Sequence, residues 1–355
     1  MDSDFARGRG RSIKGNEERM MGWPRISIVI PVYAVADYIE GCLQSVMAQT
    51  YEGEVECILV DDCSPDDSIA IARHAIDAYS GHIRFRLLAH DSNRGASAAR
   101  NTGTRAATGR YIFYLDSDDC LTPQSLAILA QPLLERDYDF VFADHSFVCD
   151  WGLTLPFALT EGPLDSNAEI ICTYRWGWYV MPWNKLLRRD FLEQNDIHFV
   201  EGIMHEDELW SFHIACVAQS AYAIPQQTYL YLLREGSVMS PERKRARYTS
   251  LDEVIRGEAA LLRQYGLESN IVLYNLIEEH KRWQMKDAVR LFDAKGAYDA
   301  YRQLRSLPAP SLFRARPLCR QWLKSAVRDV HRLLPNRLGY MYIRLLNCLS
   351  CPPAR

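Results

Sequence analysis

The 355-residue chain has no run of about 20 apolar residues, the length that a membrane-spanning helix requires. It also shows no N-terminal signal peptide, so we expect a cytoplasmic protein. Residues 1–22 are polar and contain several Gly and Arg residues, which predicts a disordered N-terminus. With 48% hydrophobic and 24% charged residues, the rest has the composition of one large globular domain with an extension.

The ten cysteines lack a repeating spacing, and several lie within apolar strand or helix patterns. This distribution is typical of reduced core cysteines in a cytosolic protein and not of a disulfide framework. Cys348 and Cys351 form a single C-x-x-C pair. A structural zinc site of this kind needs a second pair of ligands, so we predict no metal there.

Acidic residues are nearly absent from the C-terminal tail. From Ser311 onward the chain has nine Lys or Arg residues and one acid, Asp329. Subtracting these from 41 basic and 45 acidic residues leaves 32 basic and 44 acidic residues in the body. The body therefore carries a formal charge of about −12 and the tail about +8. We expect no nucleic-acid partner for so acidic a body.

The first 145 residues alternate strand and helix patterns at short spacing. The predicted strands are 26–31, 54–60, 83–88, 111–115 and 138–143, and the last predicted helix, 124–136, has a break at Pro132. This alternation predicts an α/β fold with a doubly wound, mostly parallel sheet. Loops that follow successive strands of such a sheet meet at one edge, where ligands bind.

Two local signals mark helix ends in this region. Asp37 with Glu40 resembles a capping box before the first helix. Gly109 follows Thr108 at the end of another helical pattern and is the expected C-cap of that helix.

The strand at 111–115 consists of aromatic and apolar residues, which predicts burial on both faces. It runs directly into Asp116, Asp118 and Asp119. Carboxylates so close repel one another unless a positive group lies among them. A divalent cation, held by one or two carboxylates and a substrate diphosphate, would supply that charge. The alternative is a solvated acidic turn, with Asp119 at the start of the next helix.

Several short motifs, in this order and spacing, resemble those of family 2 glycosyltransferases, which have the GT-A fold. The motifs are SIVIPVY at 27–33, VDDCS at 60–64, NRGASAARN at 93–101, LDSDD at 115–119, NK at 184–185, HEDE at 205–208 and the segment 229–237. The resemblance covers residues 24–240 and departs at Ala34, where many members have Asn. It implies a glycosyltransferase domain at 23–240, with a nucleotide-sugar half (23–145) and an acceptor half (146–240). Residues 241–355 would form a helical extension.

The resemblance implies a nucleotide-sugar donor, and a UDP-sugar in particular. Pro31 and Asn93 lie in matching motifs and are candidates for binding it. Tyr33 would stack on the uracil, and Asp62 would accept its N3–H. The alternatives are an edge aromatic for Tyr33 and a local turn cap for Asp62. Arg100 would approach the base or diphosphate, or would simply pair with an acidic side chain.

The Asp116-Ser-Asp118 segment matches the D-x-D motif of the family. By resemblance, Asp118 binds Mn²⁺ or Mg²⁺, and Asp116 contacts the ribose or the metal. The ion would bridge the diphosphate and stabilise the departing UDP as a Lewis acid. Arg234 and Ser237, in the loop after the predicted strand at 229, would also reach the diphosphate.

An inverting transferase needs one carboxylate to deprotonate the attacking hydroxyl of the acceptor. The Glu-Asp pair of the family falls on Glu206 and Asp207, which makes Asp207 the base and Glu206 its orienting or acceptor-binding neighbour. Carboxylates are also favoured at a helix N-terminus without any catalytic role. We expect His205 to be a packing or loop residue.

Other candidates for the acceptor half have equally plausible structural roles. The tryptophans at 176, 178 and 183 would line the acceptor site or pack in the core. Asn184-Lys185 matches a family segment near the acceptor site, although its basic residues are also typical of a solvated helix face.

The tail has a helical pattern with two distinct faces. Apolar residues recur at 318, 322, 323, 326, 327, 330 and 334, and basic residues recur at 316, 320, 324, 328 and 332. Basic amphipathic helices of this kind commonly lie on anionic membranes. Residues 311–350 are therefore predicted to contact the inner face of the cell membrane. The alternative is a helix docked on the acidic body.

Taken together, these patterns predict a metal-dependent, inverting glycosyltransferase that acts on a glycan or lipid-linked acceptor in polysaccharide biosynthesis. A sugar nucleotidyltransferase is one alternative, but it gives no reason for the Glu206-Asp207 pair. A non-catalytic sugar-nucleotide-binding protein is another, and the intact Asp116, Asp118 and Asp207 argue against it.

Overall fold

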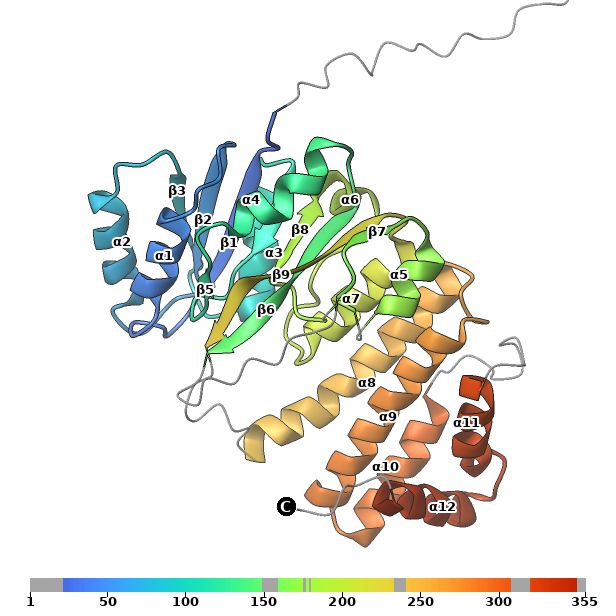
Figure 1. Cartoon of the computed structure of the whole chain (residues 1–355). Helices are drawn as coiled ribbons and strands as arrows, with labels where there is room; N and C mark the ends of the chain where they lie inside the picture. The colour runs from blue at the N-terminus through green and yellow to red at the C-terminus, as the bar shows by residue number, and fades with distance from the viewer. Residues whose placement is uncertain are drawn as a thin grey trace, which may run out of the picture.

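The computed structural model describes residues 22–148, 159–174, 177–178, 180–232, 241–307 and 320–349. Within these residues, nine strands form one sheet in the order β3-β2-β1-β4-β8-β6-β9-β5, and β7 pairs with β9 (Figure 1). The strands are β1 (Ile26–Val32), β2 (Val55–Asp61), β3 (Arg84–Ala89), β4 (Tyr111–Tyr114), β5 (Cys120–Leu121), β6 (Phe140–Val148), β7 (Gly162–Leu164), β8 (Lys185–Arg188) and β9 (Ala221–Leu232). The helices that accompany the sheet are α1 (Ile39–Met47), α2 (Ser68–Ala78), α3 (Ala96–Ala106), α4 (Ser125–Ala130) with the 3₁₀ turn η1 (Gln131–Leu134), α5 (Asn167–Thr173), α6 (Arg189–Gln194) and α7 (Glu206–Val217).

The first four long strands, β3-β2-β1-β4, are parallel and confirm the predicted doubly wound arrangement. Alternate residues of β1 face different cores, as the two-residue period of a strand requires. Val29 belongs to the cluster that contains Ala99 of α3, whereas Ile28 and Ile30 belong to the cluster that contains Leu43 of α1. The sheet is therefore covered by helices on both faces.

The other half of the sheet is mixed rather than a simple continuation of the parallel order. Strand β8 lies between β4 and β6 and is antiparallel to both, while β6 is parallel to β9. The predicted solvated helix face at Lys185 was therefore wrong. Leu186 and Leu187 are fully buried in opposite cores, which places this segment at the centre of the sheet.

Both predicted helix-end signals were wrong. Tyr38, not Asp37, occupies the N-cap of α1, without a side-chain capping bond. Gly109 lies beyond the end of α3, and a Cβ atom there would lie 2.6 Å from the backbone nitrogen of Ser27. Gly109 is required for this close approach to β1 and not for a helix cap. The break at Pro132 is confirmed, because α4 ends where η1 begins.

The C-terminal extension is helical, as predicted, and packs beside the sheet through α7 and α8 (Figure 1). Its elements are α8 (Pro241–Gln264), α9 (Ile271–Leu291), α10 (Ala294–Ser306), α11 (Arg320–Asp329), the 3₁₀ turn η2 (Val330–Arg332) and α12 (Asn336–Leu349). Trp210 of α7 and Ile255 of α8 belong to one buried cluster, so the apolar core continues from the sheet into the extension. None of the helices in the described ranges is long and apolar enough to span a bilayer.

Six cysteines whose side chains are described, at 42, 57, 63, 120, 172 and 216, are free thiols, as expected of reduced cysteines. Cys42, Cys57 and Cys216 are buried core residues, as predicted. Cys63 and Cys172 are exposed instead, so the core interpretation does not hold for them. The C-x-x-C pair at 348 and 351 reaches beyond the described residues.

Candidate active site

A cleft lies at the carboxyl ends of β1, β2 and β4, where the doubly wound sheet was expected to bind a ligand. It has a volume of about 430 Å³, within the range of small-molecule sites. Seven of the predicted site residues line it: Pro31, Tyr33, Asp62, Asn93, Arg100, Asp116 and Asp118. These residues come from four separate sequence motifs, so the fold brings the motifs together at one edge.

Tyr33 is 46% exposed and offers an aromatic ring to this cleft. The following residue, Ala34, has a φ of 52°, a left-handed conformation that Asn adopts more readily than Ala. Its backbone N–H donates to Ser64 Oγ at 2.8 Å. The departure from the family motif therefore falls on a bend of the chain.

Asp62 is buried, and its carboxylate holds the loop that precedes α3. It accepts hydrogen bonds from the backbone N–H groups of Arg94, at 2.9 Å, and Gly95, at 2.7 Å. The ring of His90 contacts the same carboxylate at 2.7 Å and Thr102 Oγ1 at 2.9 Å. The sequence analysis did not identify His90, because nothing local marks it as a partner of Asp62. The turn-cap role considered for Asp62 belongs to Asp61, whose Oδ1 accepts from Ser64 N–H at 2.8 Å.

Arg100 connects the two halves of the predicted transferase domain. Its side chain is 8% exposed, and its guanidinium lies 2.8 Å from Asp116 Oδ1 and 3.2 Å from Glu206 Oε1. These two carboxylates, with Asp207, raise the pKa of Arg100 despite the opposing effect of burial. Of the two roles considered for Arg100, pairing with acidic side chains is therefore present. The same side chain also lines the cleft.

Asn101, the next residue of the same motif, also reaches the acceptor half. Its side-chain amide donates to the carbonyl of Phe199 at 2.8 Å and accepts from the N–H of Phe199 at 2.9 Å. Helix α3 thus carries two successive polar side chains that hold the segment leading to α7.

The D-x-D residues Asp116 and Asp118 both face the cleft. One oxygen of Asp116 is engaged by Arg100, and its side chain is 25% exposed. Two carboxylates at a cleft of this size fit a Mg²⁺ or Mn²⁺ ion that also binds the phosphates of a substrate.

Asp119 has a structural role that neither sequence interpretation anticipated. It is 1% exposed, accepts from Tyr229 Oη at 2.6 Å and accepts from the N–H of Leu232 at 2.9 Å. Burial and the nearby Asp116 raise its pKa to about 8. Helix α4 begins at Ser125, so the predicted capping role of Asp119 was wrong. Instead, Asp119 fixes the end of β9 against the D-x-D loop.

Glu206 and Asp207 occupy the first turn of α7, as the HEDE motif predicted. Burial, followed by repulsion from Glu206 and Glu208, raises the pKa of Asp207 to about 7. This value suits a group that must accept a proton near neutral pH. Neither carboxylate lines the cleft itself, but Arg100 does and contacts Glu206. His205 is the N-cap residue, with a left-handed φ of 63°, which confirms its expected loop role.

Helix α7 is tied to the extension by a buried imidazole. His280 of α9 is 1% exposed, with Nε2 3.3 Å from Glu208 and Nδ1 3.0 Å from Glu258 of α8. The two carboxylates outweigh the effect of burial and raise the pKa of His280 to about 10. Sequence analysis missed this contact, since Glu208 and His280 belong to different predicted regions.

Asn184 and Lys185, within the predicted acceptor half, are buried. Asn184 donates to the carbonyls of Ala143 and Asp144, each at 2.8 Å, and accepts from Thr228 at 2.6 Å. Lys185 donates to the carbonyl of Met181 at 2.6 Å, and its burial lowers the pKa to about 7.

Of the three tryptophans considered for the acceptor site, Trp178 and Trp183 are described and pack in the core. Trp183 stacks on Tyr229 with ring centroids 4.5 Å apart, and both Trp178 and Trp183 are almost fully buried. The packing interpretation is therefore confirmed for these two. Trp176, Arg234 and Ser237 lie outside the described residues.

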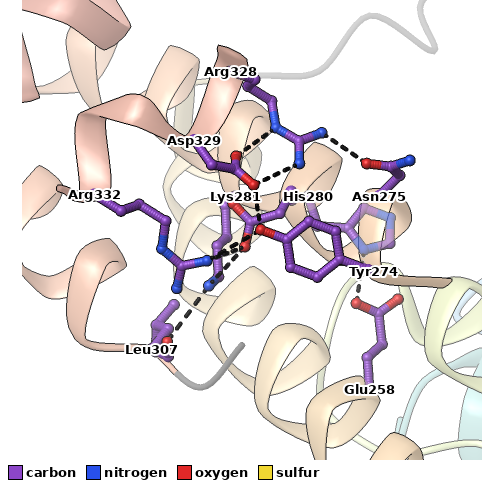
Figure 2. Close-up of polar contacts among 10 residues, drawn as sticks. Glu258, Tyr274, Asn275, His280, Lys281, Leu307, Arg328, Asp329 and Arg332 are labelled. Carbon is purple, nitrogen blue, oxygen red and sulfur yellow. Dashed lines mark hydrogen bonds and ion pairs between the residues drawn. The ribbon is translucent and has the colours of Figure 1, made fainter. Parts of the chain in front are cut away.

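A second cluster of acidic and histidine side chains lies in the extension, where Glu278, Asp329 and His331 come close enough to share a metal ion. Glu278 already pairs with Lys281 and Arg332, each at 3.2 Å, and Asp329 pairs with Arg328 at 2.7 Å. Figure 2 shows these contacts around Tyr274. Three cations beside two carboxylates disfavour a further cation, so this cluster is an ion-pair network.

Comparisons with known proteins identify the family of the chain. The model of the family described as Glycosyl transferase family 2 matches residues 27–195. The succinoglycan biosynthesis protein ExoO of Rhizobium meliloti is 31% identical over 259 residues, which span 69% of this chain and 70% of ExoO. YibD of Escherichia coli K12, an uncharacterized glycosyltransferase, is 32% identical over 228 residues, which span 60% of this chain and 63% of YibD.

A solved structure has the same architecture. TarS of S. aureus, residues 1–349 in complex with UDP-GlcNAc, matches with a TM-score of 0.67 and 20% identity, covering 90% of this chain and 89% of TarS. At 20% identity, the match shows that the two chains share a fold and shows nothing further. The family model and the identity to ExoO decide the membership: the chain belongs to glycosyl transferase family 2 and is a glycosyltransferase with the GT-A fold.

Proposed function

We propose that this glycosyltransferase moves a sugar from a UDP-sugar to a glycan or lipid-linked acceptor, with inversion at the anomeric carbon and with the help of a divalent metal ion. The observation that carries the proposal is the contact of Arg100 with both Asp116 and Glu206. It joins the D-x-D edge of the cleft to the helix that bears Asp207. A donor-binding edge and a candidate base are therefore held in one arrangement.

The lining of the cleft supports a nucleotide donor. The exposed ring of Tyr33 is available to stack on a base, and Asp62 is the nearby acceptor proposed for the uracil N3–H. Among structural neighbours, TarS was solved with UDP-GlcNAc, whereas a mannosyltransferase of Pyrobaculum calidifontis was solved with GDP-Man and Mn²⁺. We favour UDP because Tyr33 and Asp62 match the motifs implied for uracil, and GDP is the competing nucleotide.

Asp116 and Asp118 are the residues that would hold the metal. A bound Mn²⁺ or Mg²⁺ would supply a Lewis acid for the diphosphate leaving group. Arg100 neutralises part of the negative charge of Asp116, so a nucleotide diphosphate meets less repulsion at this edge.

Asp207 would act as the general base. Its raised pKa lets it take the proton from an acceptor hydroxyl as the hydroxyl oxygen bonds to the anomeric carbon. The bond between that carbon and the diphosphate oxygen breaks on the opposite face, which inverts the configuration. Glu206 would stay paired with Arg100 and keep the first turn of α7 beside the cleft.

The relatives support an acceptor that is part of a glycan. ExoO is a succinoglycan biosynthesis protein, and TarS of Staphylococcus aureus is a poly(ribitol-phosphate) β-N-acetylglucosaminyltransferase. Family membership also sets aside the alternative of a sugar nucleotidyltransferase. We infer a role in the assembly of a bacterial polysaccharide.

Thermal unfolding with UDP or GDP, with and without Mn²⁺, tests the donor site. A ligand present at 100 times its Kd stabilises the native state by about 2.7 kcal/mol. We expect a Mn²⁺-dependent shift with UDP that Asp118→Asn abolishes. The matched control is Asp190→Asn, at a carboxylate that is 64% exposed on α6. A larger shift with GDP would overturn the UDP assignment, and an equal shift in Asp118→Asn would overturn the metal site.

A further inference from the structure

Two arginines of the basic face predicted for the tail, Arg328 and Arg332, turn inward, not outward. Arg328 Nε lies 2.7 Å from Asp329, and its Nη1 lies 3.2 Å from Asn275 of α9 (Figure 2). Arg332 Nη1 lies 3.2 Å from Glu278, also on α9. For these two arginines the docked alternative is confirmed, because both are committed to partners within the extension. They are unavailable as a membrane-binding face.

The outward face of α12 is largely apolar. Leu338, Met341 and Leu345 are 53%, 65% and 60% exposed, and their spacing of three and four residues places them on one side of the helix. The opposite side is packed: Ile343 is 5% exposed, and a Cβ at Gly339 would lie 2.3 Å from the hydroxyl of Tyr301. Helix α12 is thus anchored along one side and leaves an apolar stripe on the other.

The same outward face carries positive charge. Arg337 and Arg344 are exposed and lie within the arc of about 120° that contains the three apolar residues. Residues 330–355 contain four arginines and no acidic residue. Apolar side chains flanked by arginines, whose long stems can reach the headgroup level, are the combination found in helices at anionic membrane surfaces.

We propose that the outward face of α12, formed by Arg337, Leu338, Met341, Arg344 and Leu345, docks on an anionic membrane surface. A second copy of this chain fits the same face less well. A two-fold contact would bring arginines of both copies together, and no acidic residue on this face could pair with them. This inference goes beyond the proposed transfer reaction and does not depend on it.

Co-sedimentation of the full chain with vesicles tests the proposal. Vesicles of phosphatidylcholine with 30% phosphatidylglycerol serve as the anionic probe, and pure phosphatidylcholine is the neutral one. We expect binding to the anionic vesicles that falls at least about tenfold in the triple variant L338Q/M341Q/L345Q. Each arginine near an anionic surface contributes about fivefold to binding, so R337Q/R344Q should reduce it by about 30-fold.

The matched controls are Val289→Gln, an apolar residue of α9 that is 41% exposed, and Arg302→Gln, a basic residue of α10 that is 59% exposed. Both should bind vesicles like the wild type. Equal binding by the wild type and the triple variant would overturn the proposal, as would the absence of binding to anionic vesicles. A dimer in sedimentation equilibrium that the triple variant abolishes, without vesicle binding, would assign the face to a second copy instead. Because vesicle binding needs no donor, none of these outcomes affects the test with UDP.

Discussion

Arg100 and Glu206 are 106 residues apart in the sequence, yet Nη1 of one lies 3.2 Å from Oε1 of the other. The same guanidinium donates to Asp116 at 2.8 Å. One nearly buried cation therefore fixes the distance between the proposed metal-binding loop and the helix of the proposed base. Without the cation of Arg100, holding two partly buried carboxylates here would cost folding free energy.

The first prediction concerns the geometry of this bridge. Arg100→Lys keeps the positive charge but cannot bind two carboxylates with a planar fork. We expect kcat to fall at least about tenfold, because misplacement of reacting groups by a fraction of an ångström slows transfer. Arg105→Lys, at an exposed position of the same helix where the guanidinium donates to Thr102 Oγ1 at 3.0 Å, is the control. Steady-state kinetics of both variants test this prediction. Equal losses of kcat in Arg100→Lys and Arg105→Lys would contradict a specific role for the contacts of Arg100.

The second prediction concerns pH. With a pKa of about 7, Asp207 is protonated at pH 5 and ionised at pH 9, so the rate should rise with pH and level off above about 8. Asp207→Asn should lose about 10²–10⁴-fold in kcat and lose this rising limb. Asp190→Asn should keep the wild-type profile. If the rate of Asp207→Asn still rises with pH in the same way, the group that titrates is another residue.

The third prediction links Asp119 to stability. Its folded pKa of about 8 lies above the ordinary value of 3.8, so the stability it contributes is present below pH 3.8 and is lost as pH rises through 8. Asp119→Asn keeps an acceptor for the N–H of Leu232 but cannot ionise. Relative to the wild type, the variant should gain stability between pH 4 and 9, by up to about 6 kcal/mol at about 1.4 kcal/mol per pKa unit. Urea unfolding across this pH range measures the difference in unfolding free energy between the two proteins. A difference that does not change with pH would contradict the effect of Asp119 ionisation on stability.

The fourth prediction concerns the contact between the extension and α7. His280→Gln removes the cation between Glu208 and Glu258, and leaving buried carboxylates unpaired costs about 3–5 kcal/mol. Since the pKa of His280 is raised to about 10, this stabilisation is complete below pH 6.5 and is lost as pH rises through 10.

Chemical denaturation at pH 6 and pH 10 would measure the effect of His280. The difference in unfolding free energy between the wild type and His280→Gln should be smaller at pH 10 than at pH 6. His198→Gln, at a side chain that is 59% exposed, is the matched control and should unfold like the wild type at both values. If the difference in unfolding free energy does not depend on pH, His280 is neutral in the native protein.

Local sequence pattern was sufficient to place the residues proposed for donor binding at one edge of the sheet. Asp116 and Asp118 follow a buried strand directly, and Tyr33 and Asp62 follow two others, so covalent connection alone places each at a strand end. The parallel sheet then aligns those ends, because successive strands of a βαβ unit run in the same direction. The cleft could be predicted without knowledge of any long-range contact.

The sequence alone determined the strands β1 to β4 and β6, the helices between them and the residues at the edge of the sheet, because these depend on runs and periods of a few residues. Only the tertiary structure decided which side chains pair across the molecule: Arg100 with Glu206, His90 with Asp62, and His280 with Glu208. It also inserted β8 between β4 and β6, and it turned Arg328 inward while α12 exposed Leu338. A helical period shows which residues share a face, but the face that is covered depends on packing against segments far away in the chain.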